Sequence, residues 1–337
     1  MKRREFLAQA AMLAFTSLTS SPKNMAPWEE DKSDRLYPAY LQAEKDGVLK
    51  ERVEALMAIY ENCHLCPRNC RVNRLRGETG VCRATSRVKV SSAFPHFGEE
   101  APLVGQRGSG TIFFSNCGLR CVFCQNYTIS IEGEGVEISD EQLAQTMLKI
   151  QDFGCHNINL VTPTHYVPSI VRAVRIAGQK GLHLPLVYNT GGYDNPEVIK
   201  LLDGIVDIYL PDLKYSEPSK AAQYSEGAYN YPYYAKQAIK EMYRQVGDLV
   251  INDRGVAKRG LILRHLVMPN NVGGTKAVIQ FIAEELSATT YVNLMGQYRP
   301  EYRAKDFPEI ARRIKRSEFQ DALAWAKQFG LKRLARN

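Results

Sequence analysis

Three cysteines on one short stretch are the residues of this sequence best suited to chemistry. Cys117, Cys121 and Cys124 have the spacing C-x3-C-x2-C. Three thiolates on one loop can hold three irons of a [4Fe–4S] cluster, so the fourth iron is left without a protein ligand and is open to a substrate. The spacing therefore predicts a cluster built for a reaction. The alternative is a zinc ion or a fully ligated cluster that takes its fourth ligand from Cys155 or His156.

An earlier set of cysteines has a different spacing, C-x2-C-x3-C-x11-C. We call Cys63, Cys66, Cys70 and Cys82 the first cysteine group, and the three described above the second cysteine group. Four thiolates suit tetrahedral zinc or an iron–sulfur cluster, and such tight clustering favours metal over disulfides. A metal here would cross-link a loop-rich segment with little apolar core. A structural metal is therefore expected, with a second, electron-relaying cluster and two disulfides as the alternatives.

Both groups must be positioned by the elements around them. Six short apolar segments predict strands at residues 111–115, 157–161, 185–188, 206–210, 261–267 and 290–294. A helical pattern follows each one, at residues 140–153, 167–178, 196–202, in the Tyr-rich region up to 246, at 276–286 and at 307–329. Repeated strand–helix units imply parallel strands with right-handed crossovers, as in a doubly wound sheet or an incomplete barrel. In either fold the carboxyl ends of the strands form the active face.

The second cysteine group follows the first of these strands and has an aromatic residue, Phe123, before its last cysteine. In these features the sequence resembles the radical S-adenosylmethionine (SAM) superfamily. The resemblance implies an α/β fold with a partial (β/α)6 TIM-like barrel at residues 110–337, preceded by a helical and Cys-rich metal-binding extension at residues 31–109. It also implies that the open iron binds the methionine part of SAM. Reductive cleavage then gives a 5′-deoxyadenosyl radical, which abstracts hydrogen from a substrate.

Residues 63–82, 98–100, 108–111 and 117–130 together resemble proteins related to the pyruvate formate-lyase activating enzyme. The resemblance implies an activating-enzyme-like oxidoreductase that uses SAM and a low-potential electron donor such as flavodoxin or ferredoxin. Its substrate would be a partner protein on which it makes a glycyl radical. Two alternatives stay open: a radical SAM enzyme that acts on a small molecule or a peptide, and a non-catalytic iron–sulfur or zinc protein for electron transfer or scaffolding.

The resemblance also implies cofactor-binding residues, mostly at the strand ends. They are Phe123, Thr162, Asn189, Thr190, Asp212, Lys214 and Arg264. Thr162 stands where the superfamily usually has Gly-Gly-Glu, so its role is expected from position alone. Asp212 and Lys214 match an Asp-x-Lys pair of the activating enzymes, and both side chains point to one face of the chain. Arg264 lies within an apolar strand and needs a carboxylate, either that of SAM or that of a barrel Asp or Glu.

The chain of 337 residues has a formal charge of +8, but its Lys and Arg are spread along the sequence, which argues against nucleic-acid binding. Residues 1–30 contain two arginines and a short apolar run, which predict a twin-arginine signal or a disordered tail. The apolar run is too short to span a membrane. We expect a cytoplasmic protein, because SAM and low-potential donors are supplied there, with export by the twin-arginine route as the alternative.

Overall fold

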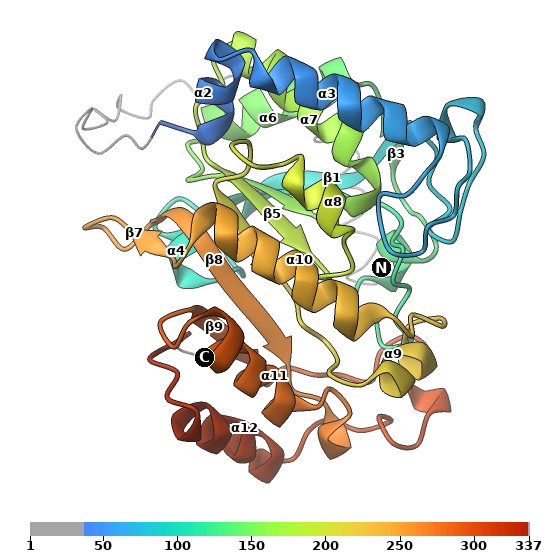
Figure 1. Ribbon diagram of the computed structural model, residues 1–337, viewed down its shortest axis with the longest axis vertical. Coiled ribbons are helices and arrows are strands. Elements are labelled where there is room, and N and C mark those ends of the chain that lie inside the picture. The colour runs from blue at the N-terminus through green and yellow to red at the C-terminus, as the bar shows by residue number, and fades with distance from the viewer. Residues whose placement is uncertain (1–36, 336–337) are drawn as a thin grey trace, which may run out of the picture. The chain divides into compact units, whose positions relative to one another are not determined.

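A ten-stranded sheet forms the centre of the structure (Figure 1). The computed structural model describes residues 37–335, so the predicted signal at residues 1–30 lies outside the described part. The strand order is β10-β9-β8-β6-β5-β4-β2-β1-β3, and β7 pairs with β8. The strands are β1 (Val88–His96), β2 (Ser109–Phe114), β3 (Val136–Ile138), β4 (Ile158–Val161), β5 (Leu186–Thr190), β6 (Ile208–Pro211), β7 (Val250–Ile251), β8 (Ala257–Leu266), β9 (Tyr291–Met295) and β10 (Arg333–Leu334).

Six strands, β2, β4, β5, β6, β8 and β9, run parallel in this order. Strands β5 and β6 are buried at every residue, as expected for parallel strands covered on both faces. The six strand–helix units and the α/β class predicted from the sequence are therefore confirmed. Within residues 37–335, the outer strands β2 and β9 are not paired with each other, so the barrel is not closed.

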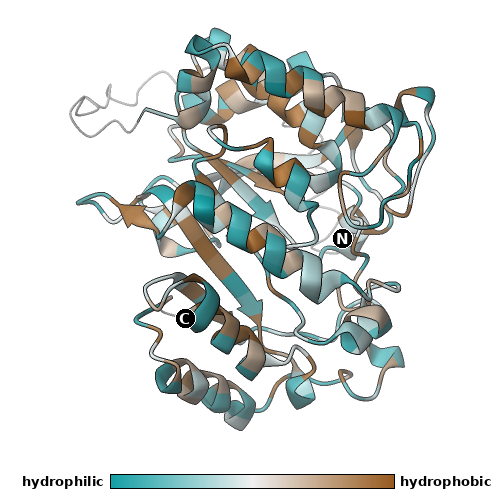
Figure 2. Ribbon diagram, viewed as in Figure 1, coloured by the Kyte–Doolittle hydropathy of each residue, from teal (hydrophilic) through white to brown (hydrophobic). Residues whose placement is uncertain are grey.

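A helix follows each parallel strand and covers the sheet. These helices are α6 (Asp140–Asp152), α7 (Val167–Gln179), α8 (Pro196–Lys200), α9 (Pro218–Tyr224), α10 (Tyr231–Val246), α11 (Thr275–Phe281) and α12 (Arg316–Gln328). Ser139 begins α6 with a capping box, as its position in the sequence predicts. Figure 2 shows strand β8 as apolar in its middle and polar towards its carboxyl end, whereas the helices around it alternate between apolar and polar residues. None of the helices within residues 37–335 is long and apolar enough to cross a membrane.

The predicted helix at residues 307–329 is wrong in its first part, since α12 begins only at Arg316. The preceding residues form an irregular segment whose backbone carbonyls bond to distant side chains. Tyr298 donates a hydrogen bond to the carbonyl of Ile310 (2.9 Å), and the Asn270 amide donates one to the carbonyl of Glu309 (2.7 Å). These tertiary contacts use carbonyls that a helix would need for its own bonds.

Residues 37–108 are part of the same compact unit as the barrel. Helices α2 (Ala39–Lys45) and α3 (Val48–Ala58) pack on α7, and the antiparallel strands β1 and β3 extend the sheet beyond β2. The short helix α4 (Ala101–Val104) lies between β1 and β2. Its Leu103 is fully buried and packs among side chains of β5, β6 and β8. The extension therefore contributes to the core of the barrel.

Candidate active site at the carboxyl ends of the parallel strands

The second cysteine group lies on the loop directly after β2. All three thiols are free, with Cys121 buried and the other two half-buried. Each sulfur has a polar neighbour: the Leu119 N–H donates to Cys117 Sγ (3.4 Å), the Ser225 hydroxyl donates to Cys121 Sγ (3.1 Å), and Ser130 Oγ lies 3.0 Å from Cys124 Sγ. The loop thus brings three sulfurs together and surrounds them with hydrogen-bond donors.

Burial dominates the acid–base behaviour of these thiols. It raises the pKa of Cys117 above its usual range and that of Cys121 to about 12, while the neighbouring Lys214 ammonium opposes the rise. Thiolates at these positions therefore need a compensating cation. Across residues 37–335, no three His, Cys, Asp or Glu side chains are placed to hold a single metal ion. The donor set of three cysteine sulfurs suits a cubane cluster, in which each cysteine binds a different iron.

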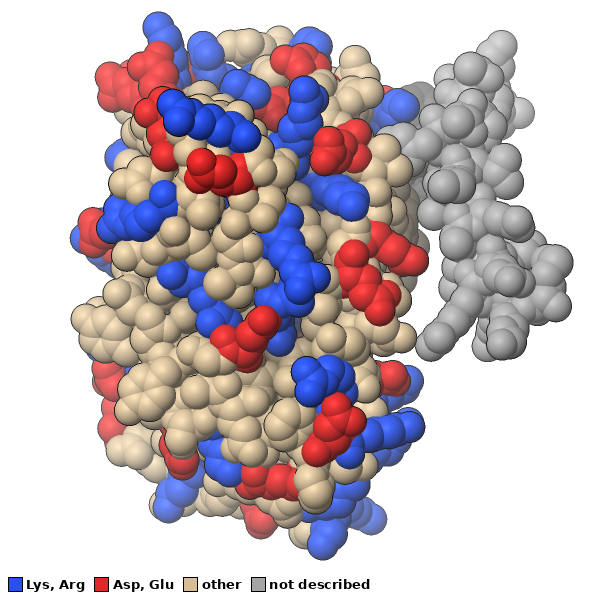
Figure 3. Space-filling view, turned by 90° about the vertical axis from the view of Figure 1, so that its right-hand side faces the viewer, with Lys and Arg blue, Asp and Glu red and all other residues tan. Residues whose placement is uncertain are grey.

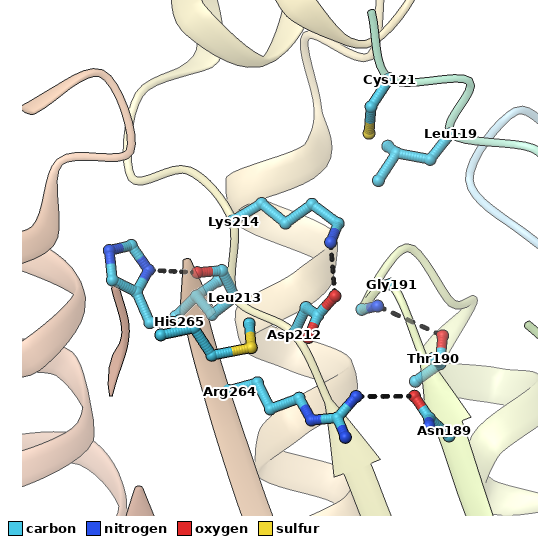
Figure 4. Close-up of polar contacts among 12 residues, drawn as sticks. Leu119, Cys121, Asn189, Thr190, Gly191, Asp212, Leu213, Lys214, Arg264 and His265 are labelled. Atoms are coloured by element: carbon cyan, nitrogen blue, oxygen red, sulfur yellow. Dashed lines mark hydrogen bonds and ion pairs between the residues drawn. The ribbon is translucent and has the colours of Figure 1, made fainter. Parts of the chain in front are cut away.

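Lys214 and Asp212 lie beside these sulfurs. Both follow β6 and form an ion pair that is mostly buried. In Figure 4 the Lys214 side chain extends from the end of β6 towards Cys121. Tyr231 fixes the turn, since its hydroxyl accepts a hydrogen bond from the Lys214 N–H (2.8 Å) and donates one to the Asp212 carbonyl (2.9 Å). One carboxylate oxygen of Asp212 is buried and has no hydrogen-bond partner. The pair thus places a cation next to the thiols and leaves a polar atom available to a ligand.

The ends of β5 and β6 approach each other closely at Gly192. This residue has φ +78°, and a Cβ built on it would lie 2.1 Å from the backbone oxygen of Asp212. Only glycine fits here, because a side chain would both strain the backbone and push the Asp212 turn away. The second glycine of the Gly-Gly pair is therefore a requirement of the site and not merely part of a flexible turn.

Gly192→Ala is expected to destabilise the fold by about 2 kcal/mol more than Gly204→Ala. Gly204 has nearly the same φ, +77°, but no atom lies within 4 Å of the point that a Cβ would occupy there, so it isolates the backbone strain from the clash. Urea denaturation of the two variants would measure the difference. Equal free energies of unfolding would contradict the close approach.

Polar residues at the ends of β4 and β5 form a network around a residue that the sequence did not single out. Asp194 is buried, and its carboxylate accepts hydrogen bonds from the hydroxyls of Thr164 (2.7 Å), Thr190 (2.6 Å) and Tyr188 (2.9 Å). The Thr162 N–H donates to the carbonyl of Asn189 (2.8 Å), and Thr162 itself has the strained φ of +60°. Thr190 is therefore oriented by Asp194, and its role towards a cofactor stays a prediction.

Arg264, on β8, lies in a network with two carboxylates from the segment before α4. Its guanidinium pairs with Glu99 and with Glu100 (2.7 Å), and it donates a longer hydrogen bond to Asn189 (3.4 Å), which Figure 4 shows. Asn293 of β9 also donates to Glu100 (2.8 Å). Of the two partners that the sequence offered for Arg264, the structure shows barrel-facing carboxylates. Binding of SAM by Arg264 remains a prediction.

Phe123 and two histidines near the strand ends, His165 and His265, are buried in the protein. The Phe123 ring packs against the rings of Tyr215 and Tyr298, with centroids 6.4 and 5.8 Å away. Burial lowers the pKa of His165 to about 3 and that of His265 to about 4, so both are neutral at physiological pH. His265 was missed from the sequence because a buried histidine in an apolar strand gives no separate signal. It holds the β6 turn by a 2.6 Å contact to the Leu213 carbonyl.

The first cysteine group lies next to the second. A small cavity of about 20 Å³ is lined by Cys66 from the first group, by Cys117 from the second and by the ends of β4 and β5. The Arg68 side chain joins the two loops, since its guanidinium donates to the backbone carbonyls of Gly118 (2.9 Å) and Ser225 (2.9 Å). Neither contact was predictable from spacing alone.

Residues 111–250 match the family model described as the Radical SAM superfamily. The match begins in β2 and includes the second cysteine group, β4, β5 and β6. The cysteine loop at the carboxyl end of a parallel strand and this match together define a protein with a radical SAM domain. A domain of this class implies an enzyme that uses a [4Fe–4S] cluster, SAM and an electron donor.

The chain is 35% identical over 303 residues to the uncharacterized protein MJ0674 of Methanocaldococcus jannaschii, over 86% of this chain and 82% of that protein, and it belongs to the same family. A second protein of that organism, MJ0808, is 24% identical over 271 residues, which are 73% of each chain. Among solved structures, methylornithine synthase (PylB) has a TM-score of 0.39 and 13% identity, covering 65% of this chain and 67% of PylB.

Proposed function

We propose that Cys117, Cys121 and Cys124 hold the [4Fe–4S] cluster of this radical SAM enzyme. The observation that carries the proposal is the gathering of three free, largely buried sulfurs at the carboxyl end of β2, next to the Lys214 ammonium. When bound, such a cluster supplies an electron that splits SAM into methionine and a 5′-deoxyadenosyl radical.

The chain's own residues have three tasks in this proposal. The three thiolates bind the cluster, and hydrogen bonds from Leu119 N–H and the Ser225 hydroxyl hold two of their sulfurs in place. Lys214 offsets negative charge beside the cluster, and the unpartnered oxygen of Asp212 accepts a hydrogen bond from the bound co-substrate. The apolar packing around Phe123 excludes water from one side of the loop.

For the reaction after SAM cleavage, we propose hydrogen abstraction from a glycine of a partner protein. Support comes from the resemblance to the activating enzymes, whose Asp-x-Lys pair this chain matches with Asp212 and Lys214. Their position beside Cys121 agrees with a role near the cluster. A small molecule or peptide substrate is the alternative that experiment must distinguish.

The electron donor would approach near the cysteine loops. These loops lie on the right in Figure 1, and Figure 3 shows Lys and Arg side chains on that face with Asp and Glu side chains interspersed among them. A surface cavity of about 240 Å³ has a mixed lining that includes Asn116, the neighbour of Cys117; its charged residues are Arg83, Arg87, Lys89, Glu132 and Glu137. The formal charge of +8 favours a donor protein with an acidic face, as electrostatic complementarity speeds association.

The test of the catalytic proposal is anaerobic reconstitution with iron and sulfide, followed by reductant and SAM. We expect 5′-deoxyadenosine and methionine in equal amounts. A fully loaded cluster that yields neither product would refute the catalytic proposal. Capture of interacting proteins under reducing, oxygen-free conditions, followed by electron paramagnetic resonance (EPR) for a glycyl radical, tests the substrate. SAM cleavage without any radical on a captured partner would favour the small-molecule alternative.

A further inference from the structure

The first cysteine group encloses a buried arginine. Arg74 is only 2% exposed, and its guanidinium donates hydrogen bonds to Cys63 Sγ (2.9 Å), to Cys82 Sγ (2.9 Å) and to the Ala84 carbonyl (2.9 Å). A buried guanidinium needs a negative charge nearby. Two of its three bonded partners are sulfurs and the third is an uncharged carbonyl. The sulfurs of Cys63 and Cys82 are therefore the atoms in contact with Arg74 that can carry this charge.

The other two cysteines face the same region. Electrostatic interaction with Cys63, Cys70 and Cys82 adds to the burial that raises the pKa of Cys66. A Cβ on Gly80 would lie 2.5 Å from Cys70 Sγ, so the chain around Gly80 packs directly on this sulfur. All four thiols are free. The fold thus brings four free cysteines close to one another, and a guanidinium donates hydrogen bonds to two of them, as hydrogen-bond donors do around the ligands of a metal site.

Three residues beside cysteines of the first group have a left-handed backbone conformation. Asn69 and Arg71, on either side of Cys70, have φ of +47° and +59°, and Arg83, directly after Cys82, has φ +60°. Non-glycine residues rarely adopt this conformation, and they keep it only where the surroundings enforce it. The strained turns direct the cysteines inwards in a segment with few apolar side chains of its own.

Gly118 of the second cysteine loop lies directly against the first cysteine group. A Cβ on Gly118 would lie 3.4 Å from Cys66 Sγ and 4.0 Å from Cys82 Cβ, and Gly118 directly follows Cys117. Arg68 joins the first cysteine group to the second cysteine loop through the Gly118 carbonyl and to the end of α9 through the Ser225 carbonyl. A structural metal for the extension would have no need of this proximity, whereas electron transfer between two centres depends on a short distance between them.

We propose that Cys63, Cys66, Cys70 and Cys82 hold a second iron–sulfur cluster that passes electrons to the cluster of the second cysteine group. This role rests on the function proposed above. A reduced low-potential donor protein, such as flavodoxin or ferredoxin, gives up one electron and is oxidised, and the second cluster is reduced by that electron and transfers it onwards. Zinc has no redox chemistry and cannot do this.

The decisive experiment removes the second cysteine group and keeps the first. In the variant Cys117→Ala/Cys121→Ala/Cys124→Ala, anaerobic reconstitution is expected to leave roughly half the iron and sulfide of the wild type, as expected if one of two clusters is lost. Dithionite should give this variant an EPR signal of a reduced cluster. Zinc instead of iron, or no metal at all in a variant with wild-type circular dichroism, overturns the proposal.

A second measurement avoids dependence on that variant. The reconstituted wild type should contain about twice the iron of Cys63→Ala/Cys66→Ala, whereas Cys155→Ala, which removes a buried cysteine outside both groups, should match the wild type. Equal iron in all three proteins overturns the proposal. Because iron and EPR signals are read without SAM, a failure of SAM cleavage would count against the catalytic proposal alone.

Arg74 gives a sharper test as a positioning residue. Its positive charge and its hydrogen bonds to two sulfurs should raise the reduction potential of the first-group cluster. In the triple-alanine variant, Arg74→Gln is expected to lower the midpoint potential in an EPR-monitored titration, and Arg74→Lys should restore part of it. A purely structural role would change the stability of Arg74→Gln and leave the potential where it was, which would overturn the role assigned to Arg74.

Discussion

Cys121→Ala is expected to abolish formation of 5′-deoxyadenosine and to lower the iron content by about one cluster per chain. A cubane held by three cysteines has no spare ligand, so the loss of one thiolate opens a second iron to solvent and oxidation. Cys121 is also the most buried of the three, and Ser225 and Lys214 would both lose the sulfur they face.

The control for this prediction is Cys155→Ala. Cys155 is buried to a similar degree, but it lies before β4 and belongs to neither cysteine group. It should keep the iron content and product yield of the wild type, measured by colorimetric iron assay and by chromatography. If Cys121→Ala matched Cys155→Ala in both iron and product, the ligand assignment would be wrong.

The sequence was sufficient to predict the six strand–helix units because parallel strands are covered on both faces. Their apolar runs, such as β5 and β6, stand out against the amphipathic helices that follow. The antiparallel strands β1 and β3 were harder to predict. β1 is largely half-exposed and β3 is only three residues long, so neither gives a strong alternating pattern.

The contacts between distant segments could not be predicted from the spacing of residues in the sequence. The position of Arg264 in an apolar strand predicts only that it needs a carboxylate. Its partner Glu100 lies 164 residues earlier, in the segment that leads into α4. Asp194 looks like an ordinary turn residue after Gly-Gly, and only the fold shows three hydroxyl groups arranged around it. Local patterns report propensity and periodicity, whereas these networks depend on which strand ends meet.

The two cysteine groups also show which features the sequence can predict and which depend on the fold. Each group could be found from its spacing, because metal ligands cluster in sequence. Their proximity could not, since it depends on how residues 59–87 fold back over the end of β2 and on one arginine, Arg68, that bonds to the carbonyl of Gly118. This proximity is the observation on which the proposed redox role of the first group rests.

Lys214→Gln is expected to reduce SAM cleavage by about two orders of magnitude and to destabilise the fold by about 3 kcal/mol. The substitution removes the cation beside Cys121 and leaves the Asp212 carboxylate unpaired in a mostly buried position. The loss of stability alone would also lower activity, because less of the protein would be folded. A second variant is therefore needed to separate the two effects.

Asp212→Asn/Lys214→Gln provides this separation. With both charges gone, no unpaired buried charge remains, so the double variant should recover most of the stability that Lys214→Gln loses. It should not recover activity, because the cation near the thiolates is still missing and asparagine binds the co-substrate less strongly than a carboxylate does. Lys220→Gln, which breaks a partly exposed pair with Glu309, should leave product formation unchanged. If the double variant recovered activity together with stability, the Asp212–Lys214 pair would be a structural ion pair only. The cation beside the cysteine loop would then have no part in the chemistry.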